Sequence, residues 1–266
     1  MEVHFLKVKT LILSLGILLS QNALADKAIK LMADEWCPYN CDPLKEPGYA
    51  IEIFNEIFKT NDKKIIYKIS DWTDAINMTR TGKNDVLVAA TVGDAPDLIF
   101  PKNEIGDSRL CFYANNSVRW KYKGLENLSK IKLGVVKSYS YGDKLDEYIK
   151  KNLENSSRLD FTLGNAPLET MTKKLLNQKI DLIVENEYVM SHFLNNTKQN
   201  TLFKNIGCEE TVKLYMAFSP KNPDAEKLAN DFDQGIQELR KNGRLKEILQ
   251  KYSINDWQIP VTTNNP

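Results

Sequence analysis

Residues 85–91 read DVLVAAT, a nearly continuous apolar run. A strand this apolar is typical of a sheet that helices cover on both faces. Upstream, Ile51, Phe54, Ile57 and Phe58 fall on one face of a predicted helix. The first third of the chain therefore reads β-α-β-α-β, which predicts a parallel α/β layer. The expected upstream elements are a strand at 28–36, a helix at 48–60, a strand at 64–69 and a helix at 73–81.

The same alternation begins again after residue 131. Strands at 108–115 and 212–218 bracket this second unit, and residues 224–252 are helical with a break at Asn242-Gly243. If the bracketing strands pair, they form a two-stranded connector. The sequence thus predicts an α/β protein of two Rossmann-like lobes joined by two hinge strands. Within the second unit we expect strands at 132–136, 159–162 and 181–184, with helices at 143–152, 166–177 and from the last strand through His192.

The amino-terminal segment has the pattern of a secretory signal peptide. Lys7 and Lys9 precede an apolar run at 10–19, and Ala23 and Ala25 are small residues that mark cleavage after Ala25. The run is about half of the ~20 residues that a membrane-spanning helix needs. An uncleaved membrane anchor is the alternative. We expect an exported, periplasmic protein.

These patterns divide the chain into four parts. We expect a signal peptide at 1–25, the first part of lobe 1 at 26–107, and the hinge strands with lobe 2 at 108–218. Residues 219–266 would supply C-terminal helices that return to lobe 1, followed by a loose tail.

Composition excludes several classes of function. The 36 Lys and Arg residues balance 35 Asp and Glu residues, which leaves a net charge of +1 and no global signature of nucleic-acid binding. Only two histidines occur, so a site of several histidines around a metal is excluded by counting. We expect neither a metal nor a cofactor.

The four cysteines are interpreted by compartment. An oxidising compartment favours disulfides over zinc sites or catalytic thiols. Cys37 and Cys41, in WCPYNC, can close a small loop. Cys111 and Cys208 either pair or remain as two buried thiols. A zinc site is weakly supported, because the C-x3-C spacing has no matching second pair.

Several stretches together resemble a known family. Their order and spacing are similar to those of type 2 periplasmic solute-binding proteins, in the branch of polar amino-acid receptors of ABC transporters (bacterial extracellular solute-binding protein family 3). The resemblance covers nearly all of residues 26–252 and implies two lobes that close on a small ligand. The stretches are GYAIEIFNEI, DAINMTRTGKNDVLVAAT, IFPKNEIG, LSKIKLGVVKSYSYGDKLDEYI, KKLLNQKIDLIVEN and DFDQGIQELRKNGRLKEILQKY.

Ligands of open α/β sheets bind beyond the carboxyl ends of the strands. In the first lobe, Asp34, Trp36 and Tyr39 follow the first strand and Trp72 follows the second. The resemblance implies an aromatic residue that packs on the ligand, a role that Trp36 or Tyr39 can fill. The alternatives are that the 37–41 loop only packs Trp36 into the lobe, and that Trp72 is a core or rim residue.

The loop after the third strand departs from the family. The resemblance implies a Thr, here Thr91, followed by an Arg that grips the ligand α-carboxylate. No Arg occurs from 81 to 108, and Asp94 stands in that region. An aspartate repels a carboxylate and attracts a cation. Arg80 and Arg109 are expected on the surface.

In the second lobe, the segment KSYSYG joins a strand to a helix. Its backbone N–H groups form a natural anion site, although helix capping by Ser140 and Asp143 explains the same residues. The resemblance implies an Asp for the ligand α-ammonium where this chain has Asn186, and Glu185 or Glu187 can supply the missing charge, with a solvated position the simpler interpretation of Glu187. The candidate ligand contacts of this lobe are Ser138, Tyr139, Ser140, Tyr141, Glu185 and Asn186.

We therefore expect a receptor without catalysis, which captures a small amino acid-like or cationic solute and delivers it to an inner-membrane ABC-type permease. We expect it to act as a monomer. One alternative is a dehydratase-like enzyme on the same scaffold, with Glu35, Asp94 or Glu185 in acid–base roles. The other is a soluble module that presents its ligand to a sensor kinase or chemoreceptor.

Overall fold

The computed structural model describes residues 28–59, 64–137, 139–164 and 166–258. The predicted signal peptide, its cleavage point and the end of the predicted tail lie outside these residues, as does the candidate ligand contact Ser138. Across the described part of the chain, every helix is too short or too polar to span a bilayer.

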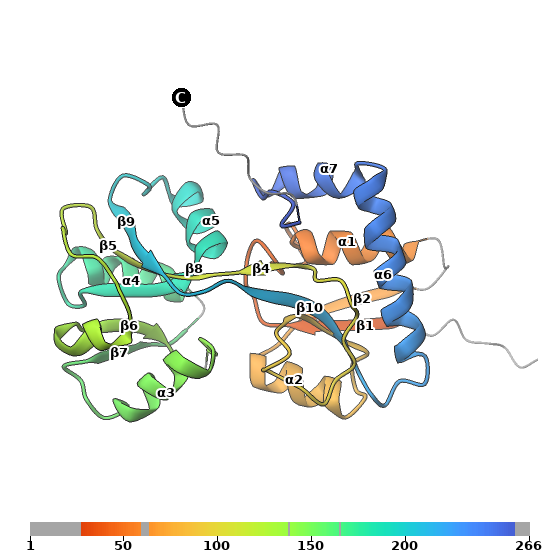
Figure 1. Ribbon diagram of the computed structural model, residues 1–266, viewed down its shortest axis with the longest axis horizontal. Coiled ribbons are helices and arrows are strands. Elements are labelled where there is room, and N and C mark those ends of the chain that lie inside the picture. Colours follow the sequence, from red (N-terminus) through yellow and green to blue (C-terminus); the bar gives the residue numbers. More distant parts are fainter. Residues whose placement is uncertain (1–27, 60–63, 138, 165, 259–266) are drawn as a thin grey trace, which may run out of the picture.

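One five-stranded sheet forms the centre of the lobe at the right of Figure 1, called lobe 1 below. Its first three strands are parallel, and β10 joins β3 in antiparallel sense. Every residue of β3 is buried, as the apolar run DVLVAAT predicts. The strands, in sheet order, are β2 (Ile65–Ile69), β1 (Ile29–Ala33), β3 (Val86–Ala90), β10 (Val212–Phe218) and β4 (Gly106–Ser108).

Helices cover both faces of this sheet. On one face, Phe54 and Phe58 of α1 pack with Phe232 of α6 and Leu245 of α7. On the other face, Ala75 of α2 packs with apolar residues of β1, β3 and β10. The helices α6 and α7 thus belong to lobe 1 although they follow lobe 2 in the chain. The bounds are α1 (Tyr49–Phe58), α2 (Trp72–Arg80), α6 (Ala225–Lys241) and α7 (Arg244–Lys251).

A second five-stranded sheet forms lobe 2, at the left of Figure 1. Leu145 of α3 packs on one face, and Met171 of α4 with Met190 of α5 packs on the other. The strands, in sheet order, are β7 (Leu159–Thr162), β6 (Leu133–Val136), β8 (Leu182–Asn186), β5 (Leu110–Asn115) and β9 (Phe203–Cys208). The helices are α3 (Asp143–Lys151), α4 (Pro167–Leu176), α5 (Glu187–Thr197) and the 3₁₀ helix η2 (Leu125–Lys130).

The chain crosses between the lobes along two extended segments that run side by side (Figure 1). Arg109 alone separates β4 in lobe 1 from β5 in lobe 2, and residues 209–211 connect β9 back to β10. On the lobe 1 side, Ser108 pairs with Val212. On the lobe 2 side, Cys111 lies opposite Cys208 and forms a disulfide with it. The crossing is therefore a two-stranded ribbon with a covalent link at one end.

The predicted α/β class with two lobes is confirmed, but the predicted hinge needs correction. The strand expected at 108–115 is interrupted at Arg109, and β5 pairs with β8 and β9 rather than with 212–218. Only Gly106–Ser108 pairs with the start of β10. The sequence analysis also did not list β9 or η2. Both disulfides form, Cys37–Cys41 and Cys111–Cys208, so the second pair is not two buried thiols.

Candidate ligand-binding cleft

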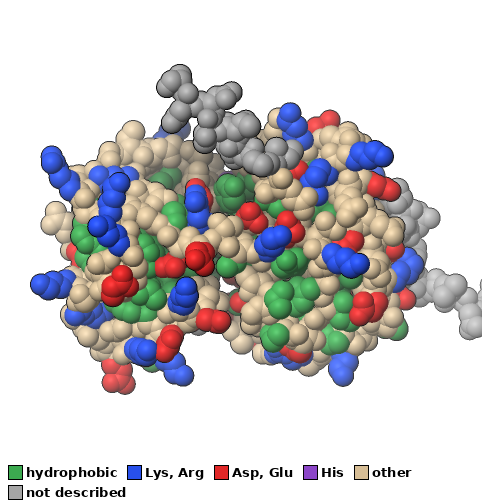
Figure 2. Space-filling view, in the orientation of Figure 1, with side chains coloured by type: hydrophobic (Ala, Val, Ile, Leu, Met, Phe, Trp, Pro, Cys, Tyr) green, Lys and Arg blue, Asp and Glu red, His purple; other side chains and the backbone are tan. Residues whose placement is uncertain are grey.

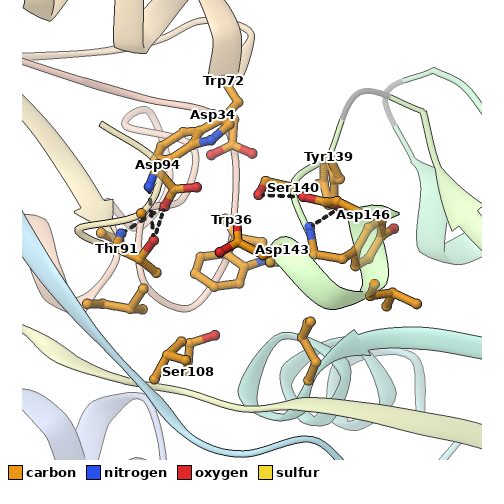
Figure 3. A pocket seen from close by; sticks show the side chains of 18 of the residues that line it. Asp34, Trp36, Trp72, Thr91, Asp94, Ser108, Tyr139, Ser140, Asp143 and Asp146 are labelled. Carbon is orange, nitrogen blue, oxygen red and sulfur yellow. Dashed lines mark hydrogen bonds between the residues drawn. The ribbon is translucent and has the colours of Figure 1, made fainter. Parts of the chain in front are cut away.

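A cavity of about 760 Å³ lies between the two lobes. Side chains of both lobes face each other across it, with Thr91 and Asp94 on one side and Ser140 and Asp146 on the other (Figure 3). The size is that of a site for a small molecule. The predicted site residues that line it are Asp34, Trp36, Trp72, Thr91, Asp94, Tyr139, Ser140, Tyr141 and Glu185.

Glu185, near the carboxyl end of β8, is 2% exposed. Its Oε1 accepts hydrogen bonds from the Asn186 backbone N–H at 2.7 Å and from the Trp36 indole N–H at 3.4 Å. Among the described residues, Oε2 has no hydrogen-bond partner and the carboxylate has no ion pair. Burial raises the pKa of the Glu185 carboxyl to about 7, and the nearby Asp34 adds to the rise.

Asp34, just beyond β1, is the corresponding carboxylate of lobe 1. It is half-buried. Burial raises its pKa to about 7, against a backbone hydrogen bond that lowers it, and the charges of Asp94 and Asp71 raise it further. The described part of the chain places no cation within salt-bridge distance of it. The cleft thus holds two carboxylates, one from each lobe, whose charges the protein leaves uncompensated.

Trp36 is held rigidly at the base of the cleft. Its ring stacks on Tyr39 with centroids 4.4 Å apart and planes 13° from parallel. Its indole N–H points to Glu185 in the other lobe. One face of the indole is therefore covered by Tyr39, and Trp36 also lines the cavity.

Tyr39 and Asn186, two further predicted ligand contacts, are not among the residues that line the cavity. Both are fully buried. The Tyr39 hydroxyl donates to the Asp107 carbonyl at 2.6 Å and accepts from Asn186 Nδ2 at 3.1 Å. Asn186 Oδ1 caps α5 by accepting from the N–H groups of Tyr188 and Val189. All polar atoms of the two side chains are therefore hydrogen-bonded within the protein interior.

Asp94 closes a short turn with Thr91 (Figure 3). Its Oδ2 accepts from the Thr91 backbone N–H at 2.8 Å and from the Thr91 hydroxyl at 2.7 Å. The two donors of Thr91 thus point to a carboxylate of the protein itself.

Asp146 makes the equivalent arrangement in lobe 2 (Figure 3). Its Oδ1 accepts from the Tyr141 backbone N–H at 2.9 Å and its Oδ2 accepts from the Ser140 hydroxyl at 3.1 Å. The N-cap of α3 is Gly142, with no side-chain cap, so the predicted capping by Ser140 and Asp143 is wrong. The Tyr141 ring is buried, and its hydroxyl accepts from the Val136 N–H at 2.8 Å.

No family model and no curated protein sequence matches this chain. Its fold, however, is similar to that of many solved structures. A Streptococcus mutans protein from work on glutathione import via GshT and the cystine ABC importer TcyBC is 19% identical, with a TM-score of 0.70 over 85% of this chain and 95% of that chain. An ancestral arginine-binding protein bound to arginine is 18% identical, with a TM-score of 0.66 over 85% and 97% of the two chains.

The chain has the fold of type 2 periplasmic solute-binding proteins. The same fold occurs in a histidine kinase sensor domain described as similar to periplasmic binding proteins, which is 20% identical with a TM-score of 0.67 over 85% of this chain and 95% of that chain. At these sequence identities the similarity establishes the architecture only. The class of ligand has to be inferred from the residues that line the cleft.

Within this binding-protein fold, several cavity residues were not predicted from the sequence, among them those of the crossing ribbon and of a bulge in β3. Val88 and Ala89 together oppose one residue of β10, and Ala89 has a left-handed φ of 58°. Bulges of this kind redirect side chains beside binding sites. No sequence pattern marks the bulge. The missed lining residues include Asn40, Val88, Ala89, Ser108, Leu110, Asp143, Lys144, Asp146, Glu209, Glu210, Val212 and Leu214.

The cavity is acidic although the chain as a whole is nearly neutral. On the outer surface, basic and acidic side chains are interspersed over both lobes (Figure 2). Among the described lining residues Lys144 is the only basic one, and Arg80 and Arg109 pair with Asp97 and Glu187 outside the cavity. The described residues include no group of three His, Cys, Asp or Glu side chains that could hold a metal ion. The acidic lining residues are Asp34, Asp94, Asp143, Asp146, Glu185, Glu209 and Glu210.

Proposed function

We propose that this chain is a periplasmic receptor that binds a small cationic solute between its lobes. The observation that carries the proposal is the pair Asp34 and Glu185, two carboxylates from opposite lobes that face the cavity without a compensating cation. Burying a carboxylate is costly unless it is paired. A ligand cation between them supplies the missing partner.

Aromatic surfaces support the same class of ligand. Trp36, Trp72 and Tyr139 line the cavity together with the carboxylates. An aromatic face attracts a cation through its quadrupole and also packs against the apolar part of an amine.

Binding of this kind favours closure of the cleft. Asp34 belongs to lobe 1 and Glu185 to lobe 2, so one cation that contacts both is bound more tightly when the lobes approach. A ligand shifts a conformational equilibrium only by such a difference in affinity. We propose that the closed, monomeric form hands the solute unchanged to an inner-membrane permease of the ABC type. The second candidate function is presentation of the bound solute to a sensor protein, because a histidine kinase sensor domain has the same fold.

The test is a binding screen of the exported protein by calorimetry and thermal unfolding. The panel holds amines, amino acids, short peptides, sugars and carboxylates. We expect cationic compounds to bind and to be recovered unaltered. Binding stabilises the folded protein by mass action, by about 2.7 kcal/mol at a hundredfold excess over Kd, and thereby raises the melting temperature. Tight binding of an anionic compound with no response to cations would contradict the proposal. Consumption of a bound compound would favour the enzyme alternative.

Delivery is tested separately in the organism that carries the chain. We expect deletion of its gene to reduce uptake of the solute identified by the screen. Unchanged uptake with loss of a transcriptional or motility response to that solute would favour a sensor partner.

We expect the affinity for the cation to fall in acid. A cation binds to the ionised carboxylates, whose pKa values in the empty protein are raised to about 7 for Asp34 and Glu185. Below pH 7 each bound proton must leave before the cation binds. The apparent Kd therefore rises about tenfold per pH unit for one coupled proton, or roughly a hundredfold between pH 7 and pH 5. Calorimetry from pH 5 to pH 8 measures this, and a Kd that is constant over that range would contradict it.

A further inference from the structure

We infer that the solute is an amine that carries no free carboxylate, because the cleft is acidic, has no arginine among its described lining residues, and directs the donors of Thr91, Ser140 and Tyr141 to its own aspartates Asp94 and Asp146. This inference rests on the proposed function and specifies which cations the cleft accepts. It distinguishes an amine from the amino acid of the same side chain.

A bound carboxylate requires either a guanidinium or ammonium group or a set of free N–H and O–H donors. Among the described residues that line the cavity there is no arginine. Lys144 is exposed on the first turn of α3. The described residues of the inner cleft therefore include no positive charge that could grip a carboxylate.

In lobe 1, the two donors of Thr91 are already used. The backbone N–H and the hydroxyl of Thr91 both donate to Asp94 Oδ2, at 2.8 and 2.7 Å. A ligand carboxylate would have to displace this aspartate, which is tethered three residues away and is held by two charge-assisted hydrogen bonds.

In lobe 2, the Tyr141 N–H and the Ser140 hydroxyl are used in the same way. The Tyr141 N–H donates to Asp146 Oδ1 and the Ser140 hydroxyl donates to Asp146 Oδ2. The first turn of α3 also borders the cavity, but it carries the carboxylates of Asp143 and Asp146, which offset the positive end of that helix. Asp146 thus accepts from two of the donors in the segment for which an anion site is predicted.

The remaining charges oppose a ligand carboxylate and attract an amine. The Trp36 N–H is directed to Glu185 Oε1, and Glu185 Oε2, in a side chain that is 2% exposed, is left without a partner. Asp94 lies near enough to raise the pKa of both Asp34 and Asp146, so the carboxylates of the two lobes face one another. A molecule with an ammonium group and no anionic group satisfies this arrangement.

The decisive experiment compares matched pairs of ligands on the exported protein by calorimetry at pH 8. The pairs are lysine with cadaverine, arginine with agmatine, and ornithine with putrescine. We expect the amine of a pair to bind at least a hundredfold tighter than its amino acid. An amino acid that binds as tightly as its amine overturns this inference and leaves the cationic receptor intact. Binding by neutral or anionic compounds in place of every cation overturns both.

A double variant then locates the cause. In Asp94→Ala with Asp146→Ala, the donors of Thr91, Ser140 and Tyr141 become free and two repelling charges are removed. We expect the disadvantage of the amino acid to shrink at least tenfold. Asp97→Ala is the matched control, because this exposed aspartate pairs with Arg80 outside the cavity. The control variant should prefer the amine to the amino acid by the same factor as the original protein. If the double variant folds and still prefers the amine to the amino acid by the same factor, Asp94 and Asp146 are not the cause of the preference. If the double variant does not fold, the comparison of matched ligands on the original protein still tests the inference.

Discussion

Replacing Glu185 by glutamine is expected to weaken binding of the cationic solute by about a hundredfold or more while stabilising the empty protein at pH 8. Glutamine keeps the shape of the side chain, and its Oε1 can still accept from the Asn186 and Trp36 N–H groups. Only the negative charge is lost, and with it the buried partner of the ligand cation. Removing one partner of a buried charge pair is among the costliest changes in binding.

The gain in stability follows from proton linkage. The pKa of Glu185 is raised from 4.5 to about 7 on folding, so the folded state binds more protons than the unfolded state between these values. The free energy of unfolding therefore falls as the pH rises from about 4.5 to 7 and stays low above 7. A rise of this size corresponds to roughly 3 kcal/mol at most. The glutamine variant is spared this loss.

Urea unfolding at pH 5 and pH 8, with calorimetry on the same samples, measures both effects. We expect the stability difference between the variant and the original protein to be larger at pH 8 than at pH 5. Glu187→Gln is the control, because this neighbouring glutamate pairs with Arg109 away from the cavity. A Glu185→Gln protein that binds the cation normally would remove the main support for the proposed function.

Removing the disulfide between Cys111 and Cys208 is expected to cost about 4–5 kcal/mol of stability, against about 2 kcal/mol for the disulfide between Cys37 and Cys41. The first closes a loop with a sequence separation of 97 residues and the second one of 4 residues. In the chain-entropy description, the longer loop restricts the unfolded chain more. Double Cys→Ser variants of each pair, unfolded in urea, measure the two costs. If the two disulfides contribute equally to the free energy of unfolding, restriction of the unfolded chain is not the main source of their stabilisation.

The sequence predicts most of the framework because apolar periodicity determines which faces are buried. DVLVAAT identifies β3, and the elements on either side of it follow in the expected order. The strand β9, read as FKNIGC, has no such signal. It lies at the edge of its sheet, and its pairing is irregular near Gly207. Edge strands with bulges bury few side chains and leave little pattern in a sequence.

The cleft is less predictable than the framework because it depends on where individual side chains turn. Nine of the predicted contacts line the cavity, since residues after strands collect at one edge of a sheet. Tyr39 and Asn186 are equally close in sequence to those edges, but they are hydrogen-bonded to each other in the protein interior and do not reach the cavity. The sequence already suggests that Asp94 disfavours a carboxylate, but the hydrogen bonds by which Asp94 and Asp146 take up nearby donors are visible only in the folded geometry.

The two lobes differ in how the chain builds them. Lobe 2 is assembled from the single continuous segment 110–208, whereas lobe 1 takes the strand β10 and the helices α6 and α7 from beyond that segment. Because a chain is synthesised from its amino terminus, the whole of lobe 2 is available for folding while lobe 1 still lacks part of its central sheet. The cleft, which needs both lobes, can form only once the chain beyond residue 208 is present.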